Sequence, residues 1–441
     1  MDIASSIKQC GVVGSGGAGF PTHVKVDADV KVAIINGAEC EPLLMSDKFL
    51  LETSIDRIIG GLEYIMEATG AETGYIALKE KYPGPLASVR RATEGRDSIH
   101  VFPLGDYYPA GDEFLLVYEV TGKVVPEGGI PLHVGCVVDN VETALNVYEA
   151  VKNQRPVTTR YLTCTGEVSS PGVVEVPIGT PVSDVIELCG GPLIEDYVVV
   201  LGGPLMGKVE TDLKTPVTKT TSGIIVLDRD HEVVRRKTIP LEFMVKQSRT
   251  VCCQCTYCTE LCPRYLLGHD LQPHMIMRQI GYGIDEPARV IENAFLCSGC
   301  GLCEVYACVM GLSPSAINTV LKERLADQGY KPSFDGKKIE PHEMRDFRKI
   351  PTSRIVNRLQ LTKYSRREVK RGLSMSPKRV EIPLKQHLGE PATAVVGPGD
   401  RVEKGSLIAE VSEDGLGAAV HASISGGVAV VDEERIIIER S

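Results

Sequence analysis

Residues 252–263 read CCQCTYCTELCP. With Cys253 set aside, the run has the pattern C-x2-C-x2-C-x3-C-P, which is the spacing that holds a [4Fe–4S] cluster. A tight loop with three cysteines lets their thiolates surround one cube while backbone amides turn toward its sulfurs. The proline after the fourth cysteine ends this loop and turns the chain away. The stretch predicts a small helical domain built around metal.

A second cysteine run follows. Residues 297–308 read CSGCGLCEVYAC, the pattern C-x2-C-x2-C-x4-C, with one extra residue before the last cysteine and no proline after it. In two-cluster ferredoxins the fourth cysteine of each run binds the cluster of the other run. We therefore predict one cluster on Cys252, Cys255, Cys258 and Cys308, and a second on Cys297, Cys300, Cys303 and Cys262. Cys253 is interpreted as a buried neighbour that could replace Cys252.

Zinc is the alternative metal, because paired C-x2-C motifs also make zinc sites. A tetrahedral zinc ion takes four ligands, whereas each run here has three close cysteines and a distant fourth. Two such runs favour two [4Fe–4S] clusters, which carry single electrons and need a source and a sink elsewhere. The chain has 14 cysteines, and because a reducing cytosol keeps thiols free, we expect no disulfides.

Composition limits the class of protein. With 441 residues, 43% hydrophobic and 24% charged, the chain is expected to form three or four soluble domains. No apolar stretch approaches the roughly 18 residues of a membrane span, and the first ten residues do not read as a secretory signal. The cytoplasm is therefore the expected compartment. The net charge of −10 argues against a nucleic acid as the main partner.

One stretch departs from this acidic balance. Residues 363–379 carry seven Lys or Arg against the single acidic residue Glu368. The stretch is interpreted either as part of a solvated basic linker over residues 331–380 or as a docking strip for an acidic redox partner.

The N-terminal region is rich in glycine: residues 12–21 read VVGSGGAGFP. Gly14, Gly16, Gly17 and Gly19 would let backbone amides approach a phosphate closely, and Lys25 could add a charge. The loop matches neither a clear G-x-G-x-x-G unit nor a P-loop.

Strands and helices alternate along the region that follows. A strand over residues 30–35 runs into a polar loop over 36–42, and ligands of open α/β sheets bind at such strand ends. Further strands at 75–78, 98–102 and 134–138, with a helix at 141–153, predict an α/β domain with a mainly parallel sheet.

Four stretches carry a resemblance to a known family. GGAGFPT at 16–22, NGAECEP at 36–42 and NVET at 140–143 resemble the FMN-binding motifs of the respiratory NADH dehydrogenase flavin subunit. They are closer to the Rnf complex C subunit and to the PduS-type cobalamin reductases, and YPAGDE at 108–113 resembles the segment beside their flavin. The resemblance implies FMN held by Gly14, Gly16, Gly17, Gly19, Lys25, Asn36, Glu39, Glu41, Glu113, Asn140 and Thr143.

Within that set, the resemblance places Lys25 and the pair Asn140 and Thr143 at the phosphate. Asn36, Glu39 and Glu41 would lie near the ring or ribityl chain. Each residue also has a simpler interpretation. Lys25 could be a surface lysine, Glu39 and Glu41 could cap the next helix, and Asn140 could be a helix N-cap with Thr143 one turn inside.

Two further modules complete the predicted order. Residues 158–226 contain short β-branched runs with a helix near 182–188 and resemble the SLBB β-grasp domain, either a ligand site or a spacer. Residues 382–441 resemble a barrel-sandwich hybrid, the fold of biotinyl and lipoyl carriers. The matching turn, EDGLG at 413–417, has no lysine to carry a swinging arm, so a docking or packing role is expected.

The predicted architecture is multidomain α/β. It comprises a Rossmann-like FMN/NADH-binding domain at 1–155, an SLBB β-grasp domain at 156–235, a helical two-[4Fe–4S] ferredoxin-like domain at 236–330, the basic linker at 331–380 and a C-terminal barrel-sandwich hybrid at 381–441. In the Rnf C subunit the barrel comes first. Its C-terminal place here, with the x4 spacing before Cys308, favours the cobalamin reductase type.

The resemblance implies an NADH-dependent flavin and iron–sulfur oxidoreductase. NADH would reduce FMN, and single electrons would pass through the clusters to a corrinoid, a cob(III)alamin or cob(II)alamin, in a bacterial microcompartment. No separate acid–base pair is expected. One alternative is an Rnf-like electron-transfer subunit working with membrane-bound partners. The other is a cluster-bearing scaffold whose flavin site is vestigial.

Overall fold

A four-stranded parallel sheet forms the N-terminal domain, in the order β3-β2-β1-β5. The computed structural model describes residues 2–440 apart from 284–287, 335 and 413–414. The strands are β1 Val32–Gly37, β2 Thr73–Lys79, β3 Ile99–Leu104 and β5 Cys136–Asn140. The helices are α1 Ile3–Gln9, α2 Thr22–Val26, α3 Ser46–Thr53, α4 Ile55–Thr69, α5 Pro83–Thr93, α6 Glu113–Thr121 and α7 Val141–Asn153, with a 3-10 turn η1 at Pro131–Val134.

Alternating side chains explain why both faces of this sheet are covered. Ala33 and Ile35 of β1 point into a core with α4 and α7, whereas Ile34 points into a second core with α6. This is the period-two alternation of a buried strand. The sequence placed α7 correctly and each strand within two residues of its observed start. The predicted α/β class is confirmed.

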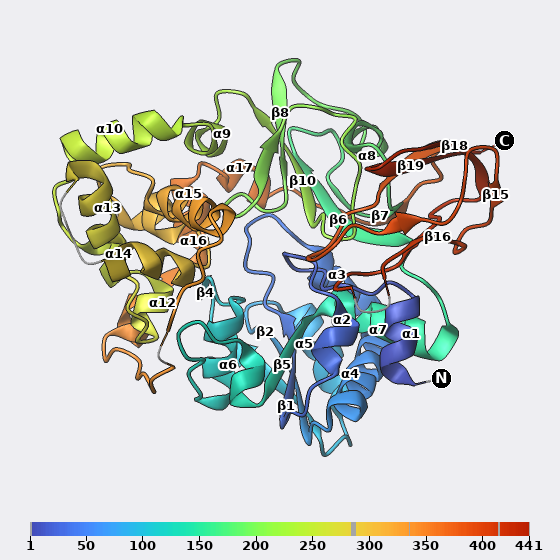
Figure 1. Ribbon diagram of the computed structural model, residues 1–441, viewed down its shortest axis with the longest axis horizontal. Helices are drawn as coiled ribbons and strands as arrows, with labels where there is room; N and C mark the ends of the chain where they lie inside the picture. The colour runs from blue at the N-terminus through green and yellow to red at the C-terminus, as the bar shows by residue number, and fades with distance from the viewer. Residues whose placement is uncertain (1, 284–287, 335, 413–414, 441) are drawn as a thin grey trace.

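A six-stranded sheet forms the second domain, in the order β12-β7-β6-β10-β8-β9 (Figure 1). The strands are β6 Thr159–Gly166, β7 Gly172–Pro177, β8 Tyr197–Leu201, β9 Lys208–Glu210, β10 Gly223–Asp228 and β12 Lys370–Ser374. The helix predicted near 182–188 is α8, Val182–Leu188, and α9 spans Glu232–Lys237.

Residues 331–380, expected as a basic linker, contain regular structure instead. Strand β11, Ile350–Pro351, pairs with β4, Tyr107–Tyr108, and β12 pairs with β7. Between them lie α16 Thr352–Arg358 and α17 Thr362–Ser365, and a 3-10 turn η4 at Arg345–Arg348 precedes β11. The cations of the basic stretch are partly used within the chain, because Lys363 pairs with Glu167 and Arg371 with Glu52.

The cysteine runs lie in a helical domain at the left of Figure 1. Its core contains Met244, Ile276, Leu296 and Ile317 together with Cys262. Its elements are α10 Leu241–Val251, α11 Tyr257–Glu260, α12 Pro263–Leu266, α13 Pro273–Tyr282, α14 Ala288–Glu292, η2 Asn293–Leu296, η3 Cys303–Ala307 and α15 Pro314–Asp327. No helix in the described part of the chain is long and apolar enough to cross a membrane.

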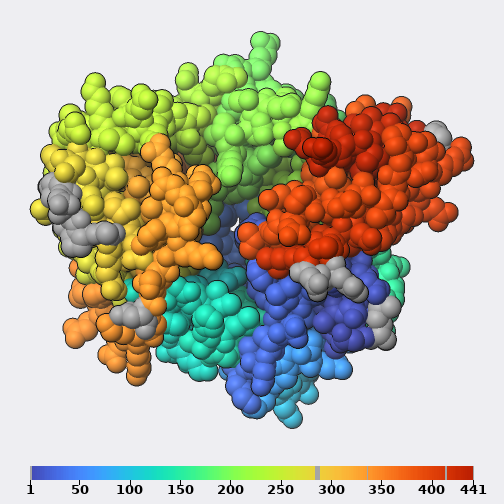
Figure 2. Space-filling view, in the orientation of Figure 1, coloured from blue at the N-terminus to red at the C-terminus, as the bar shows by residue number. Residues whose placement is uncertain are grey.

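Two small antiparallel sheets form the C-terminal barrel, in the orders β13-β19-β18-β15 and β14-β16-β17. The strands are β13 Arg379–Pro383, β14 Thr393–Ala394, β15 Arg401–Val402, β16 Leu407–Glu410, β17 Val420–His421, β18 Gly426–Val431 and β19 Arg435–Glu439. Of the turn that decided against a carrier role, Glu413 and Asp414 lie outside the described residues. Figure 2 shows the orange and red barrel seated against the blue N-terminal residues.

Candidate functional site: a glycine-rich loop joined to two cysteine runs

The glycine-rich loop is closed at its base by an antiparallel bridge between Val13 and Pro21. Inside the bridge the Gly14 amide donates to Phe20 O over 2.9 Å. Gly16, Gly17 and Ala18 form an exposed tip, and in the described structure no hydrogen bond engages their backbone amides. A run of free amides at a turn is suited to an anion such as a phosphate. The loop therefore fits the phosphate of a flavin nucleotide.

The start of α7 supports this loop from below. Thr143 Oγ1 accepts a hydrogen bond from the Ser15 amide over 3.0 Å. Asn140 is at the N-cap position, but its side chain caps no helical amide. A Cβ placed on Gly16 would lie 2.3 Å from Asn140 Nδ2, so the Asn140 side chain packs closely against the loop at this glycine. The structure thus brings Asn140, Thr143 and the loop together at the positive end of α7.

Lys25 lies nearby but is already paired. Its ammonium donates to Val138 O and lies 3.3 Å from Asp139 Oδ1 and 3.7 Å from Glu113 Oε1. Burial lowers the pKa of Lys25, but the two carboxylates outweigh it, so the pKa is raised. Lys25 is therefore not a surface lysine. Sequence reasoning missed Asp139, whose Oδ2 is buried without a partner.

Asn36 is the second-last residue of β1 and holds the 108–113 segment. Its Nδ2 donates to Gly111 O over 2.9 Å, and its Oδ1 accepts from the Ala38 amide over 3.2 Å. Glu113 is the first residue of α6. Its carboxylate faces Lys25, and 45% of its side chain is exposed to solvent. Asn36, Lys25 and Glu113 thus belong to one region at the carboxyl ends of the strands.

Glu39 and Glu41 have other partners than a flavin. Glu39 caps α3, since its carboxylate accepts from the Asp47 and Lys48 amides over 3.1 and 3.3 Å. It also pairs with the Lys48 ammonium at 3.4 Å. Glu39 therefore takes the helix-capping role that was its simpler interpretation.

Glu41 instead reaches the β-grasp domain. Its carboxylate accepts from the amides of Leu205 and Met206 over 2.9 and 3.1 Å. A Cβ on Gly203 would lie 2.0 Å from Glu41 Oε2, so that glycine makes room for the carboxylate. Glu41 caps no helix; it joins two domains.

The flavin side and the cysteine runs touch directly. Asp112, the N-cap of α6, forms an ion pair of 2.9 Å with Arg264, two residues after Cys262, and both side chains are nearly buried. The Arg264 guanidinium lies 3.5 Å from the centre of the Phe114 ring. The Tyr108 hydroxyl donates to Cys300 O over 2.7 Å and lies 3.1 Å from Glu41 Oε1. Sequence reasoning missed Arg264. Its place directly after Cys262 and Pro263 was the one signal that could have pointed to it.

The eight cysteines separate into two neighbourhoods. A cavity is lined by Cys262, Cys297, Cys300 and Cys303, three of which are buried. Cys258 has Cys308, Cys252 and Cys255 as near neighbours. Burial raises the pKa of Cys258 to about 12, and these three thiols add to the rise, whereas Cys262 adds least. These neighbourhoods would allow the crossed ligation that the sequence predicts, which stays a prediction.

The cysteine environment fits iron–sulfur clusters. Among the described residues, no three His, Cys, Asp or Glu side chains converge on one point as ligands of a single ion. Backbone amides turn toward sulfur, with Gly299 N 3.4 Å from Cys297 Sγ and Leu312 N 3.3 Å from Cys308 Sγ.

The extra residue before Cys308 also has a structural explanation. Residues 303–307 form a π-helical turn, η3, and the Cys308 amide donates to Cys303 O over 2.9 Å. A π turn accommodates one more residue than an α turn. Cys253, expected as a buried neighbour, is instead exposed, because it lies in the loop after α10.

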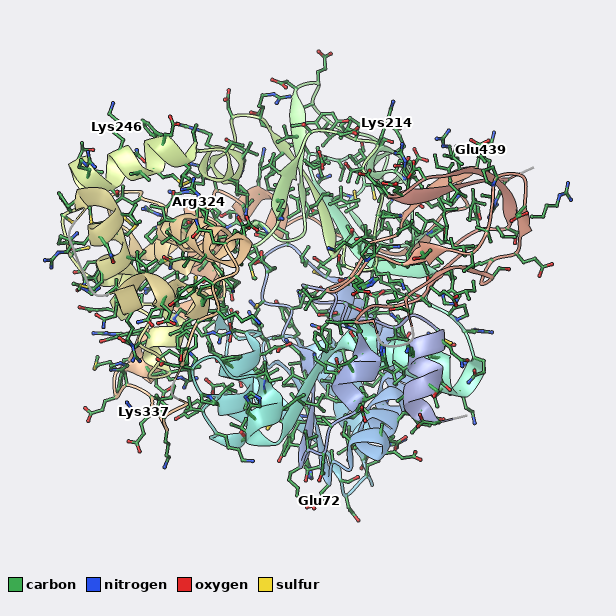
Figure 3. All side chains as sticks on the ribbon, in the orientation of Figure 1. Glu72, Lys214, Lys246, Arg324, Lys337 and Glu439 are labelled. Atoms are coloured by element: carbon green, nitrogen blue, oxygen red, sulfur yellow. The ribbon has the colours of Figure 1, made fainter. Side chains whose placement is uncertain are left out.

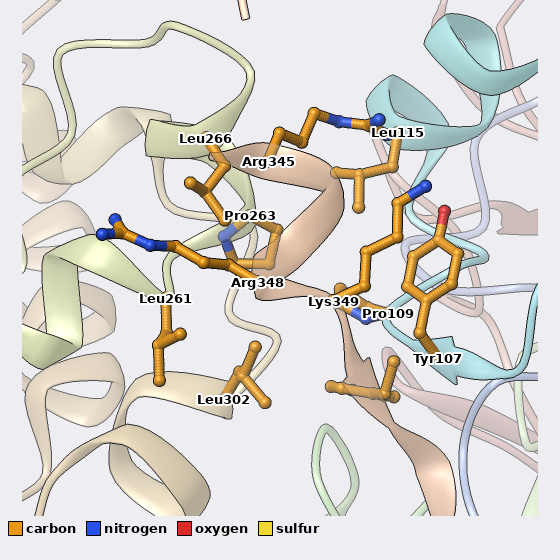
Figure 4. Close-up of a pocket in the computed structure, with 11 residues that line it drawn as sticks. Tyr107, Pro109, Leu115, Leu261, Pro263, Leu266, Leu302, Arg345, Arg348 and Lys349 are labelled. Atoms are coloured by element: carbon orange, nitrogen blue, oxygen red, sulfur yellow. The ribbon is translucent and has the colours of Figure 1, made fainter. Parts of the chain in front are cut away.

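A small cavity lies where the flavin domain meets the cluster domain (Figure 4). Tyr107, Pro109 and Leu115 line one side, and Pro263 and Leu302 line the other. The cations at its rim are already paired: Arg345 and Lys349 with Glu119, and Arg348 with Glu260. The cavity is therefore a seam between domains and not a ligand site.

Four family models match the chain. The Nuo51 FMN-binding domain matches residues 7–149, the SLBB domain 161–209, the 4Fe-4S dicluster domain 251–313 and the RnfC barrel sandwich hybrid domain 362–440. These matches confirm the predicted FMN, β-grasp, two-cluster and barrel domains in the predicted order.

Curated relatives match over the whole length. Cobalamin reductase PduS of Salmonella typhimurium is 40% identical over 439 residues, 100% of this chain and 96% of that protein. PduS of Citrobacter freundii is also 40% identical, over 99% of this chain and 96% of its own. The C subunit of the Na(+)-translocating ferredoxin:NAD(+) oxidoreductase complex of Acetobacterium woodii is 33% identical over 60% of this chain and 58% of its own.

A solved structure shares the fold. An NAD+-reducing [NiFe]-hydrogenase in the H2-reduced state superposes with a TM-score of 0.51 at 22% identity, covering 75% of this chain and 63% of that chain. At that identity the likeness concerns the fold alone. The full-length identity to two cobalamin reductases, carried by the same four domains, decides the family. This chain belongs to the PduS family of cobalamin reductases.

Proposed function

We propose that this protein is an NADH-dependent reductase of a corrinoid, with FMN and two [4Fe–4S] clusters as its redox groups. One observation carries the proposal: the glycine-rich site is joined directly to the cysteine runs. The buried Asp112–Arg264 pair and the Tyr108–Cys300 hydrogen bond make this connection. Bound FMN would accept the hydride of NADH and give up its electrons singly, and the clusters would carry them singly.

The residues of the chain bind and orient the flavin in this proposal. The free amides of Gly16 and Gly17, with the N-terminus of α7 behind them, hold the phosphate. Thr143 fixes the loop through the Ser15 amide. Lys25 is held in place by Asp139 and Glu113, so it adds little net charge. Asn36 fixes the Gly111 segment beside the ring.

Burial gives the two clusters an order. Cys262, Cys300 and Cys303 are buried, and Cys300 O accepts a hydrogen bond from Tyr108 of the flavin domain; we call their group, with Cys297, the inner cysteines. The outer cysteines, Cys252, Cys255, Cys258 and Cys308, are each half-buried. The neighbours Val251, Tyr257 and Val309 are 36%, 48% and 58% exposed. Electrons are therefore proposed to leave through the outer cysteines.

An anaerobic assay tests the function. Purified protein is mixed with NADH and cob(III)alamin, and flavin bleaching and corrinoid reduction are followed by absorbance. The proposal expects both, with two one-electron corrinoid reductions per NADH. If no flavin bleaches and no corrinoid is reduced, the proposal fails.

A second candidate is an Rnf-like subunit, which the match to the RnfC barrel and the Acetobacterium woodii relative support. We place the protein within a bacterial microcompartment in the first case and beside membrane-bound partners in the second. Fractionation of cells distinguishes them, since copurification with microcompartment shells favours the corrinoid reductase and copurification with membranes favours the Rnf-like role.

A further inference from the structure

Behind the glycine-rich loop, three domains meet at one buried lysine. Lys219, between β9 and β10, is 3% exposed. Its ammonium donates to Gly11 O of the flavin domain and to Ala419 O of the barrel, each over 2.7 Å. Its backbone amide donates to Gln386 Oε1 over 3.1 Å. No salt bridge within the described residues involves Lys219, so two carbonyls replace the usual counter-ion.

Both ends of the loop are pressed against this junction. A Cβ on Gly11, at φ +66°, would lie 2.2 Å from Ala419 O and 2.8 Å from Lys219 Nζ. A Cβ on Gly19, at φ +69°, would lie 2.9 Å from Thr220 Cγ2 and 3.0 Å from His387 Cα. The Leu388 amide also donates to Gly19 O over 3.2 Å. Neither glycine can move away without losing a contact to another domain.

The barrel is fixed to the flavin domain by a shared core. Ile7 and Val12, which flank the start of the loop region, pack in the same apolar cluster as Ile408, Val420 and Ile436 of the barrel. His421 of the barrel also lies against the backbone of Gln9. A barrel packed in this way cannot swing between partners.

Burying a lysine without a carboxylate is costly. A polar group at such a site is retained more readily when it fixes one arrangement of the chain. The two carbonyls that Lys219 joins lie on segments 408 residues apart in sequence, Gly11 and Ala419, so one side chain sets the distance between the loop base and the barrel.

We propose that Lys219 is a positioning residue for the flavin-phosphate loop, and that the C-terminal barrel is the rear wall of the flavin site. Lys219 acts through the loop and does not touch the flavin. This inference rests on the proposed function only in that the loop holds FMN. It assigns the barrel a role that neither a carrier nor a docking module would have.

The test compares Lys219→Met with Lys214→Met in the full chain. Lys214 lies in the same connection but is exposed and reaches into solvent (Figure 3). Flavin-stripped protein is titrated with FMN, and the quenching of the FMN fluorescence is measured. Lys219→Met should weaken FMN binding about tenfold, because a loop that is no longer pre-ordered must be ordered on binding. Lys214→Met should bind FMN as the wild type does.

Hydrogen exchange gives a readout without any flavin. The amides of Gly14 and Thr22, which donate to Phe20 O and Val12 O, report on the loop base. In Lys219→Met they should exchange about tenfold faster, while core amides of β10 and the iron content stay unchanged. A wild-type protein that takes up no FMN would contradict the proposed function. The hydrogen-exchange measurement at Gly14 and Thr22 would still decide whether Lys219 orders the loop.

Two results would overturn the inference. One is a Lys219→Met protein with FMN affinity within about twofold of wild type and unchanged exchange at the loop base. The other is a general loss of exchange protection and iron, which would make Lys219 only a stability residue. If the Lys219→Met protein does not fold, Gln386→Met replaces it, because it removes the acceptor of the Lys219 amide and should show the same pattern.

Discussion

At the scale of single residues, the contact between the flavin domain and the inner cysteines depends on one buried ion pair. Asp112 caps α6 and faces Arg264, and their side chains are 7% and 11% exposed. Arg264 also lies over the Phe114 ring. Cys262 is two residues from Arg264. The contacts of Arg264 with Asp112 and Phe114 therefore also position that cysteine relative to the glycine-rich site.

Removing Arg264 should therefore damage both stability and electron transfer. Arg264→Met leaves Asp112 buried without its counter-ion, which should cost about 3 kcal/mol of stability. Thermal unfolding and the rate of cluster reduction by NADH measure the two effects. The double variant with Asp112→Asn should recover part of the stability, and Arg324→Met, an exposed change on α15, is the control. Equal behaviour of Arg264→Met and Arg324→Met would contradict the prediction.

Lys219 also predicts a dependence on pH. Burial lowers its pKa from 10.5 to about 7, so between these values the unfolded chain binds more protons than the folded one, and stability rises with pH. His387 and His421 face the same junction. Burial, and then Lys219, lower their pKa to about 4 and about 3, so both stay neutral in this range. The unfolding temperature should rise more between about pH 7 and 9 in wild type than in Lys219→Met; parallel profiles would contradict this.

At the scale of elements, the sequence located what depends on local pattern. The helix α7 and the strands of the parallel sheet follow apolar periodicity, and the cysteine spacing gave the two cluster neighbourhoods. The short strands β11 and β12 were missed because their partners, β4 and β7, lie about two hundred residues earlier in the chain. The contacts of Glu41 with Leu205 and Met206 were missed for the same reason, since these partners belong to a different domain. Lys219 had no sequence signal at all.

Helix α3 offers a test of one such residue. Glu39→Gln keeps the size of the side chain but removes its charge from the N-terminus of α3 and from Lys48, so the unfolding free energy should fall by about 1 kcal/mol. FMN affinity should change by less than about threefold, because the carboxylate is fully engaged by the helix. Fluorescence titration with FMN decides. A loss of affinity larger than the loss of stability would instead place Glu39 at the flavin.

At the scale of the whole molecule, the packing of the domains supports the proposed direction of electron transfer. The flavin domain, the β-grasp domain and the second cysteine run share one core, in which Tyr108, Val200 and Leu302 pack together. The first run adds Cys262 to the inner group and leaves its other cysteines toward the surface. On the proposed function, a path from NADH to an acceptor would therefore meet the inner cysteines first. An arrangement in which both clusters lie equally close to the flavin domain does not fit this burial.

The order can be tested by removing one cluster at a time. Cys300→Ala and Cys258→Ala should each lose about half of the bound iron, because each removes a ligand of one cluster. In Cys258→Ala, NADH should still give the electron-spin signal of the reduced inner cluster, while corrinoid reduction is lost. In Cys300→Ala, the outer cluster should stay oxidised on the timescale of turnover, since its donor is missing. Fast reduction of the outer cluster in Cys300→Ala would reverse the proposed order, and corrinoid reduction that survives in Cys258→Ala would move the exit to the inner cysteines or to the flavin.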